Sequence, residues 1–278
     1  MTEDTAHTEC VINSSQSLKS YLYNLIAYRE LLYFFVWRDL LVRYKQAFFG
    51  ISWALVRPLL NMCVFAFVFG RIAQFSAHHV NYGLFVLSAT LPWQYFASAV
   101  VDATHSLVNH SHLISKAFFP RILIPLSQVF VNLVDLAVTA VVLFLWSFIT
   151  GDLNPWIPLT FPCVVLFATL LISGVSLWLS ALTVKYRDFK IVVPFLVQFG
   201  MFVSPVGYGT FVIPEKWQWL FCLNPLVGLI DSFRWAFLGV TYSGIIYSIG
   251  CSIVLTLGIL ISGLIYFRNM DRSFADEI

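Results

Sequence analysis

The residue of greatest chemical interest in this sequence is an acid inside an apolar run. Asp135 is the single charged side chain between residues 122 and 149. A carboxylate in such a segment is costly in a lipid environment, so it either serves a function or hydrogen-bonds a neighbouring helix. The sequence offers no second acid or base at an equivalent position. A proton relay therefore has no support, and we favour a structural role for Asp135.

A cluster of basic residues follows an aromatic segment near the N-terminus. Arg38, Arg43 and Lys45 come after residues 21–37, which are rich in Tyr, Leu and Phe. Arginine can hold phosphate oxygens through two parallel hydrogen bonds, and lysine attracts them as a point charge. These bases therefore either bind a phosphate group or simply hold the segment on anionic lipid.

The histidines at positions 105, 110 and 112 do not favour a metal site. Spacings of five and two residues do not bring the three rings to one helix face. No lysine follows a glycine, which excludes a P-loop, and neither His-Glu-x-x-His nor Gly-x-Ser-x-Gly occurs. The sequence therefore carries no ATPase or hydrolase motif of these kinds.

Composition indicates the class of protein. Hydrophobic residues make up 59% of the 278 residues and charged residues only 11%, against roughly a quarter charged in an ordinary soluble domain. These charges are too few to cover a soluble surface, so most of the surface must face lipid. The net charge of +2 does not indicate a nucleic-acid-binding protein. Five widely spaced cysteines do not indicate a disulfide framework.

Apolar stretches predict an all-α integral membrane protein with six transmembrane helices, because about 20 apolar residues cross a bilayer as a helix. The predicted spans are residues 51–70, 82–101, 122–149, 157–184, 191–207 and 245–267. An even number of spans places both termini on one side. With the N-terminus in the cytoplasm, 13 of the 16 basic residues, Arg57 included, fall in inner segments. This distribution satisfies the positive-inside rule.

The segments outside the spans complete the predicted organisation. We expect residues 1–20 to form a cytoplasmic tail and residues 21–47 to form an amphipathic helix in the membrane interface. The alternative is that residues 21–47 belong to an ordinary N-terminal tail. Residues 51–267 form the six-span domain, and residues 268–278 a second cytoplasmic tail.

The outer segment 204–244 is apolar but interrupted by Asn224 and Pro225. A proline at that position ends or kinks a helix, and each half is too short to cross a bilayer. We expect two short re-entrant or surface helices between spans five and six. The alternative is a loop packed on the outer face of the bundle.

The inner segment 102–121 mixes polar residues with Leu113 and Ile114 and precedes Pro120. This pattern predicts a short amphipathic helix that stops before the proline. Such a helix on the cytoplasmic side is a candidate docking surface for a partner protein. The alternative is a simple connection between two spans.

Short motifs recur in a characteristic order along residues 29–270. They are Arg43-Tyr44-Lys45-Gln46, Phe49-Gly50, Trp53, Pro58-Leu59, Leu113-Ile114-x-Lys116-x-x-Phe119-Pro120-Arg121, Ile124-Pro125, Tyr186-Arg187-Asp188, Pro194, Gln198, Ser204-Pro205-Val206, Asn224-Pro225 and Arg234. This set resembles the polysaccharide-exporting ATP-binding-cassette permeases of the type-2 exporter class. One departure is Ala47, near which the family pattern leads us to expect a threonine.

The resemblance implies a half-channel that dimerises and exports a lipid-linked polysaccharide such as O-antigen, capsule or teichoic acid across the bacterial inner membrane. Two copies of a separate ATPase subunit supply the ATP and Mg chemistry, and this chain itself needs no cofactor. The segment with His105, Leu113, Ile114 and Lys116 is then the ATPase-coupling region.

The same resemblance assigns expected roles to the bases and to aromatic stripes. Arg38, Arg43 and Lys45 would meet the pyrophosphate of a polyprenyl carrier. The aromatic residues recur at helical spacing, so each set shares one helix face. They are Phe65, Phe69, Phe195, Phe199 and Phe202. These rings either line a sugar path or face lipid and pack the bundle.

Two other classes of protein remain as alternatives. An ion-coupled secondary transporter or flippase usually carries internal repeats and paired intramembrane charges. No internal repeat occurs, and Asp135 stands alone. A membrane-embedded glycan enzyme requires at least two acids facing the substrate. The outer segments contain only Asp152, Glu215 and Asp231.

Overall fold

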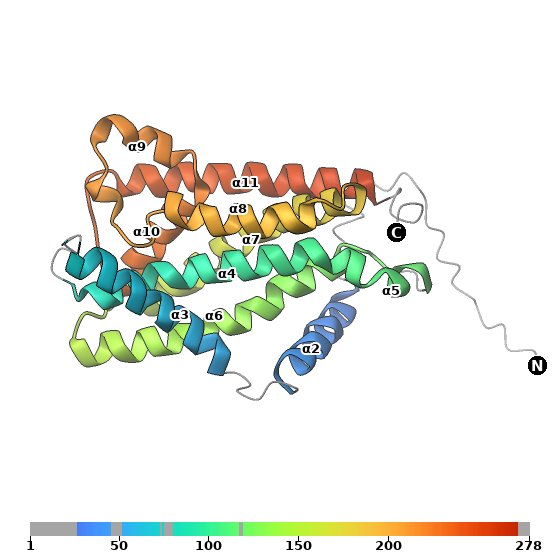
Figure 1. Ribbon diagram of the computed structural model, residues 1–278, viewed down its shortest axis with the longest axis horizontal. Helices are drawn as coiled ribbons and strands as arrows, with labels where there is room; N and C mark the ends of the chain where they lie inside the picture. Colours follow the sequence, from blue (N-terminus) through green and yellow to red (C-terminus); the bar gives the residue numbers. More distant parts are fainter. Residues whose placement is uncertain (1–26, 46–51, 73, 75–79, 117–118, 272–278) are drawn as a thin grey trace, which may run out of the picture.

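The protein is a helical bundle in a computed structural model that describes residues 27–45, 52–72, 74, 80–116 and 119–271 (Figure 1). The elements are α2 Arg29–Lys45, α3 Ser52–Phe65, the π-helical η1 Ala66–Ile72, α4 Tyr82–Asn109, α5 Ser111–Lys116, α6 Leu123–Thr150, α7 Ile157–Lys185, α8 Phe189–Val203, the 3-10 turn η2 Thr210–Val212, α9 Glu215–Cys222, α10 Pro225–Leu238 and α11 Ile245–Met270. The described residues contain no strand, which confirms the predicted all-α class.

Among the described residues, five helices are long and apolar enough to cross a membrane: α3 with η1, α4, α6, α7 and α11. They coincide with five of the six predicted spans. The fifth predicted span, residues 191–207, corresponds to α8, which has only 15 residues. At 1.5 Å per residue α8 is about 22 Å long, less than the roughly 30 Å of a hydrocarbon core. Its predicted end was wrong because Ser204 is extended before Pro205.

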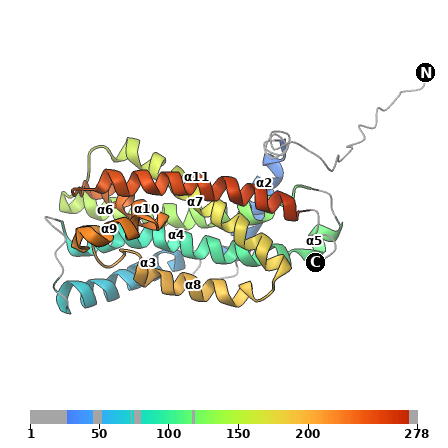
Figure 2. The ribbon, with the colours of Figure 1, turned by 90° about the horizontal axis from the view of Figure 1, so that it is seen from above.

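Helix α4 forms the centre of the bundle. It packs against α3, α6, α7, α8 and α10, and the two perpendicular views show it running between them (Figures 1 and 2). Its side chains are buried around most of its circumference. A helix that is apolar on all sides is expected in such a central position.

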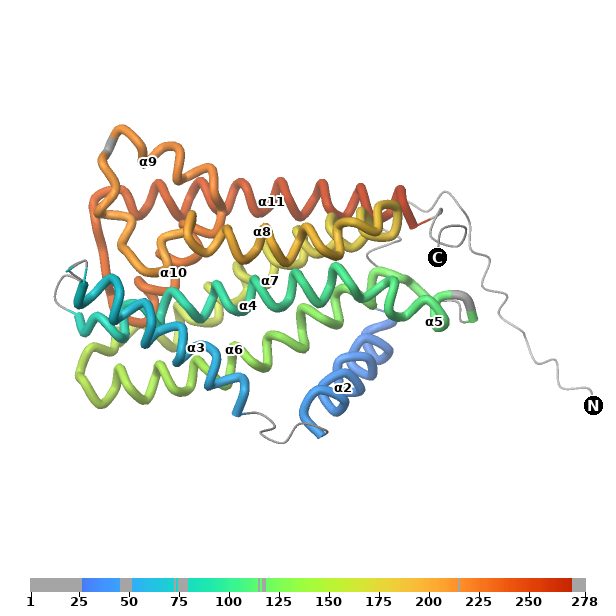
Figure 3. The backbone as a smooth tube through the Cα atoms, in the orientation of Figure 1, coloured from blue at the N-terminus to red at the C-terminus, as the bar shows by residue number. Residues whose placement is uncertain are grey.

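The segment 102–121 was predicted to contain a short helix that stops before Pro120, and the structure divides this segment between the end of α4 and the short helix α5. The α4 helix continues to Asn109, so the first part of that segment extends the second span. The separate helix is α5, which begins at Ser111 and ends at Lys116. We call the end of the bundle that carries α5 the α5 end; the tube in Figure 3 shows α9 and α10 at the opposite end, which we call the α10 end.

A proline inside α3 frees a backbone carbonyl, and a neighbouring helix satisfies it. Pro58 has no N–H to donate to the carbonyl of Ala54, one turn earlier. The hydroxyl of Thr139 on α6 donates to that carbonyl at 3.0 Å instead. In a membrane protein such freed groups must find a partner within the protein. This hydrogen bond therefore joins α3 to the middle of α6.

A proline also frees a backbone carbonyl in α8, and a side chain of a neighbouring helix contacts that carbonyl. Pro194 cannot donate to the carbonyl of Lys190. The Nε2 of His105 on α4 lies 3.2 Å from that carbonyl oxygen, so this nitrogen must carry the ring proton. His105 thus joins the α5 end of α4 to the first turn of α8.

The segment between α8 and α11 contains the two expected short helices. Asn224 caps α10, its side chain accepting from the N–H of Leu226, and Pro225 takes the first helical position. Every residue of α10 from 226 to 238 except Trp235 is buried. Helix α9 instead exposes Trp217 and Trp219. Therefore α10 enters the bundle, whereas α9 lies on its surface.

Helix α2 lies obliquely across the bundle and packs on α6 (Figure 1). Phe35 is buried there, while Tyr33, Phe34, Trp37 and Leu41 are exposed. The exposed aromatic face suits the predicted interfacial position. Residues 21–26, 46 and 47 of the predicted helix lie outside the described part of the chain.

Candidate functional site

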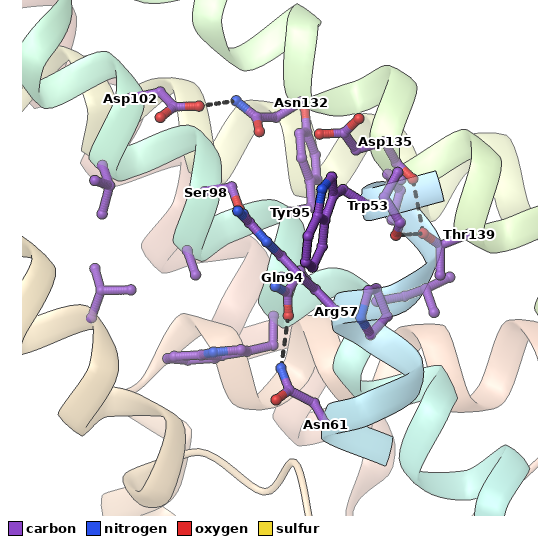
Figure 4. Close-up of a pocket in the computed structure, with 18 of the residues that line it drawn as sticks. Trp53, Arg57, Asn61, Gln94, Tyr95, Ser98, Asp102, Asn132, Asp135 and Thr139 are labelled. Carbon is purple, nitrogen blue, oxygen red and sulfur yellow. Dashed lines mark hydrogen bonds between the residues drawn. The ribbon is translucent and has the colours of Figure 1, made fainter. Parts of the chain in front are cut away.

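A cavity of about 660 Å³ opens between α2, α3, α4, α6 and α8. Its lining combines aromatic rings with amide and hydroxyl groups: Tyr44, Trp53, Asn61, Trp93, Gln94, Tyr95, Ser98, Asn132, Thr139 and Gln198. Figure 4 shows many of these side chains pointing into the same space. Aromatic faces pack on apolar C–H surfaces, and amides can donate to and accept from hydroxyl groups. The cavity is therefore suited to a polar, ring-containing ligand.

One arginine at the edge of this cavity is held between two carboxylates. The Nη2 of Arg43 lies 2.6 Å from Asp102 on α4, and its Nη1 lies 3.0 Å from Asp135 on α6. The same Nη1 donates to the side-chain oxygen of Asn132 at 3.0 Å. The planar guanidinium makes these contacts at once, which a lysine could not do. Arg43 thereby ties α2 to α4 and α6.

Asp135 therefore has the basic partner that the sequence did not reveal. The hydroxyl of Tyr44, next to Arg43, also donates to the Asp135 carboxylate. On the other side, Asn132 donates to Asp102 at 2.9 Å (Figure 4). We call Arg43, Tyr44, Asp102, Asn132 and Asp135 the Arg43 cluster.

The two other predicted headgroup bases differ from Arg43. Arg38 pairs with Asp39 at 2.8 Å and contacts Nε2 of His110 at 2.9 Å. Because Nδ1 of His110 lies 2.9 Å from the carbonyl of Ser106, Nδ1 donates and Nε2 accepts from Arg38. Lys45 is exposed at the last residue of α2. Of the three bases, only Arg43 lines the cavity.

The predicted coupling residues lie on or near α5, but some of them are buried and others are exposed. Ile114 is buried in a cluster with Phe35, and Leu113 packs beside it. Lys116 is exposed, and His105 contacts α8 as described above. A partner at the α5 end would therefore meet Lys116 rather than Ile114.

The aromatic stripes do not line the cavity of the single chain. Phe195, Phe199 and Phe202 are 60–67% exposed on one face of α8. The cavity is lined instead by the neighbouring face of that helix, which includes Gln198. Phe65 and Phe69 stack with their ring centroids 5.6 Å apart.

Gly207, in the loop after α8, lies against the stacked rings of Phe65 and Phe69. A Cβ on this glycine would lie 2.5 Å from Phe65 and 2.7 Å from Phe69. The absence of a side chain therefore lets both rings approach the loop after α8. The hydroxyl of Tyr82 on α4 donates to the backbone carbonyl of Gly207.

A second set of polar side chains lies at the α10 end around the buried carboxylate of Asp231. We call Asp231 and the residues that bond it the Asp231 group. Asp231 on α10 accepts from three hydroxyls, those of Thr210 at 2.9 Å, Tyr242 at 2.7 Å and Ser248 at 3.0 Å. Burial raises the pKa of the Asp231 carboxyl, which the charge of Arg234 opposes. The three donors come from η2, the loop after α10 and α11, so Asp231 joins three segments.

Arg234 lies one turn further along α10. It is 2% exposed, donates to the carbonyl of Val206 at 3.1 Å, and its Cζ lies 3.8 Å from the Phe85 ring centroid. Its Nε and Nη1 make no hydrogen bond to any described residue. Only about 10 Å³ of space remains beside it, which is about the room that one water needs.

Sequence reasoning missed the cavity-lining polar residues within the spans. Asn61, Gln94 and Arg57 each interrupt an apolar run, and such interruptions are the signal that could have identified them. Arg57 was counted with the inner segments, close to one end of the first predicted span. It is in the second turn of α3, between contacts to the middle of α6 and the middle of α4.

Comparisons with known proteins agree with this architecture. Residues 30–238, more than half of the chain, match the model of the ABC-2 type transporter membrane family. The chain is 31% identical over 260 residues to the O-antigen export system permease protein RfbA of Klebsiella pneumoniae. That alignment covers 91% of this chain and 97% of the relative.

Two further relatives are more distant. The O-antigen export system permease protein RfbA of Myxococcus xanthus is 28% identical over 76% of this chain and 81% of its own length. The polysialic acid transport protein KpsM of Escherichia coli is 22% identical over 85% of this chain and 92% of its own length.

Proposed function

This chain belongs to the ABC-2 type transporter family of membrane proteins, and we propose that it is the permease subunit of a polysaccharide export system. The relatives that it matches over most of their length are named for O-antigen export and polysialic acid transport. The cargo class is therefore a bacterial surface polysaccharide.

The observation that carries the proposal is the cavity between the predicted spans. Its aromatic and amide lining provides the contacts that sugars make, namely ring stacking and hydrogen bonds to hydroxyls. A purely structural cavity between apolar helices would be lined by aliphatic side chains.

The energy source is a separate ATPase subunit, present in two copies with its own ATP and Mg. The exposed Lys116 on α5 offers a surface where it can dock. The permease itself is a homodimer in the bacterial inner membrane, with both termini and α5 in the cytoplasm. Helix α8 completes the sixth crossing together with the turn of residues 204–207 that follows it. The distribution of basic residues supports this orientation.

The cargo is linked to a polyprenyl pyrophosphate. Arg38 lies at the α5 end, where it contacts His110 and where a lipid headgroup would be met first. Lys45 is exposed at the last residue of α2 and can meet a headgroup that approaches beside the bundle. Arg43 contributes to binding of the pyrophosphate only if its guanidinium releases Asp102 and Asp135 and binds phosphate oxygens instead.

A deletion strain tests the proposal. Loss of the gene should remove the polysaccharide from the cell surface and leave lipid-linked glycan inside the cell, detected by mass spectrometry of extracted lipids. Loss of the partner ATPase gene should give the same result. An ion-coupled transporter would keep exporting without that ATPase, and this outcome would overturn the proposal.

A further inference from the structure

Arg57 is a cation near mid-height in the bundle, and its depth is fixed by two contacts on either side of it. The carbonyl of Ala54, one turn before, accepts from Thr139 near the middle of α6. Asn61, one turn after, donates to Gln94 near the middle of α4 at 3.1 Å. A full positive charge at this depth is costly unless it meets water or an anion.

No carboxylate of the described chain meets this charge. The acids of the cavity, Asp102 and Asp135, are both bound to Arg43 at 2.6 and 3.0 Å. Within the described residues, the guanidinium of Arg57 makes no ion pair and no hydrogen bond. Its Cζ lies 6.0 Å from the ring centroid of Trp53. The side chain extends from α3 across the cavity beside that ring (Figure 4).

The cavity around Arg57 is polar on the opposite wall. Gln94 and Ser98 of α4 and Gln198 of α8 line it together with Arg57. These groups can orient hydroxyls or phosphate oxygens, while Trp53 provides a flat surface for a sugar ring. The guanidinium offers a planar pair of donors that fits two oxygens of one anion.

We propose that Arg57 binds an oxyanion of the cargo, a phosphate or carboxylate group, as the cargo passes the middle of the membrane. This inference rests on the proposed export function and identifies the chemical class of ligand that the cavity takes. Two sources of the oxyanion share this chemistry: the pyrophosphate of the lipid carrier and the carboxylate of an acidic sugar.

The test uses the purified permease–ATPase complex in nanodiscs without ATP. Binding of a short-chain polyprenyl pyrophosphate, the matching polyprenol, an oligosaccharide containing glucuronic acid and a neutral oligosaccharide is measured for each variant. Arg57→Gln should weaken binding of an anionic probe about 10- to 100-fold, as expected when one hydrogen-bonded charge is lost. Binding of the polyprenol and the neutral oligosaccharide should stay within about threefold.

Two variants control for folding and for nonspecific charge. Arg57→Lys keeps the charge and should retain more anionic-probe affinity than Arg57→Gln. Arg71→Gln removes a positive charge from η1, outside the cavity lining, and should leave binding unchanged. A loss confined to polyprenyl pyrophosphate identifies the carrier as the source, and a loss confined to the glucuronic acid probe identifies the sugar.

Unchanged affinity of Arg57→Gln for both anionic probes would overturn the inference. So would equal losses for anionic and neutral probes, because a packing role would not distinguish them. Export is measured separately in the deletion strain. Failure of the polysaccharide-export proposal would appear there as normal surface polysaccharide, whatever Arg57 binds.

Discussion

Two regions of the bundle, the edge of the cavity and the α10 end, hold their charged residues in different ways. At the edge of the cavity, Arg43 bridges two carboxylates whose side chains keep about a third of their surface exposed. At the α10 end, Asp231 and Arg234 are almost fully buried among hydroxyls, a backbone carbonyl and the Phe85 ring. Contacts beside an open cavity can be exchanged for ligand contacts, whereas enclosed ones cannot without unfolding the segment. We therefore expect the contacts of the Arg43 cluster to be exchangeable, and those of the Asp231 group to form a fixed structure at the α10 end.

The largest expected effect tests the fixed end. Asp231→Ala leaves the buried hydroxyls of Thr210 and Ser248 and the half-buried hydroxyl of Tyr242 without their acceptor, and each lost partner in a buried site costs about 1–3 kcal/mol. We expect a loss of at least about 3 kcal/mol in the free energy of unfolding, measured as a lower thermal midpoint in detergent. Asp152→Ala, in the loop after α6, serves as the matched control. If both variants melted alike, the α10 end would not be the rigid region.

A smaller effect is expected at the Arg43 cluster. Arg43→Gln should cost about 1–2 kcal/mol, because partial exposure screens the ion pairs. In a double-mutant cycle with Asp135→Asn, we expect a coupling free energy of about 1 kcal/mol. Arg43→Lys should also loosen α2, seen as faster hydrogen exchange, since lysine cannot reach all three acceptors. Additive single effects would show that the pair does not hold α2 in place.

On α5, the exposed Lys116 and the buried Ile114 allow a similar comparison between a surface position and an enclosed one. Lys116→Glu should leave the thermal midpoint unchanged and weaken association with the ATPase about tenfold, as for a reversed charge at an interface. Size exclusion of the solubilised complex measures this. Ile114→Asp, in contrast, places a charge in the buried cluster and should lower the midpoint itself. If Lys116→Glu and Ile114→Asp changed the thermal midpoint equally, the result would contradict the observation that Ile114 is buried and Lys116 is exposed.

The smallest effect is expected on the exposed face of α8. Phe199→Leu should change the thermal midpoint and export by little, within about 0.5 kcal/mol for a surface position. Trp53→Leu, which alters the cavity wall, should lower export more. The two variants are compared by surface polysaccharide at equal protein level. A greater loss with Phe199→Leu would place the cargo path on that face of α8.

Sequence periodicity predicted most of the fold because long apolar runs have few alternatives to a transmembrane helix. The break at Asn224 and Pro225 was equally informative, since a capping residue before a proline specifies a helix start. The length of α4 was less predictable, because tertiary contacts and not composition decide how far such a helix continues. The end of α8 was readable from Pro205, which disfavours a helical conformation of the residue before it, but the apolar run concealed that signal.

The candidate site was harder to predict. The pairing of Arg43 with Asp102 and Asp135 joins residues 59 and 92 positions apart, and no local pattern encodes such distances. The stripe at Phe195 was visible from spacing, but spacing alone does not say which neighbours a face meets. Arg57 was visible too, yet its depth became clear only from the contacts of Ala54 and Asn61.

The most direct test of the central claim is transport by the purified complex. The permease and its ATPase are reconstituted in proteoliposomes with lipid-linked polysaccharide, and ATP is supplied on the ATPase side. We predict that polysaccharide becomes accessible to an added glycosidase inside the vesicles only with ATP and with both subunits present. Transport without ATP hydrolysis, or by the permease alone under an ion gradient, would contradict the account.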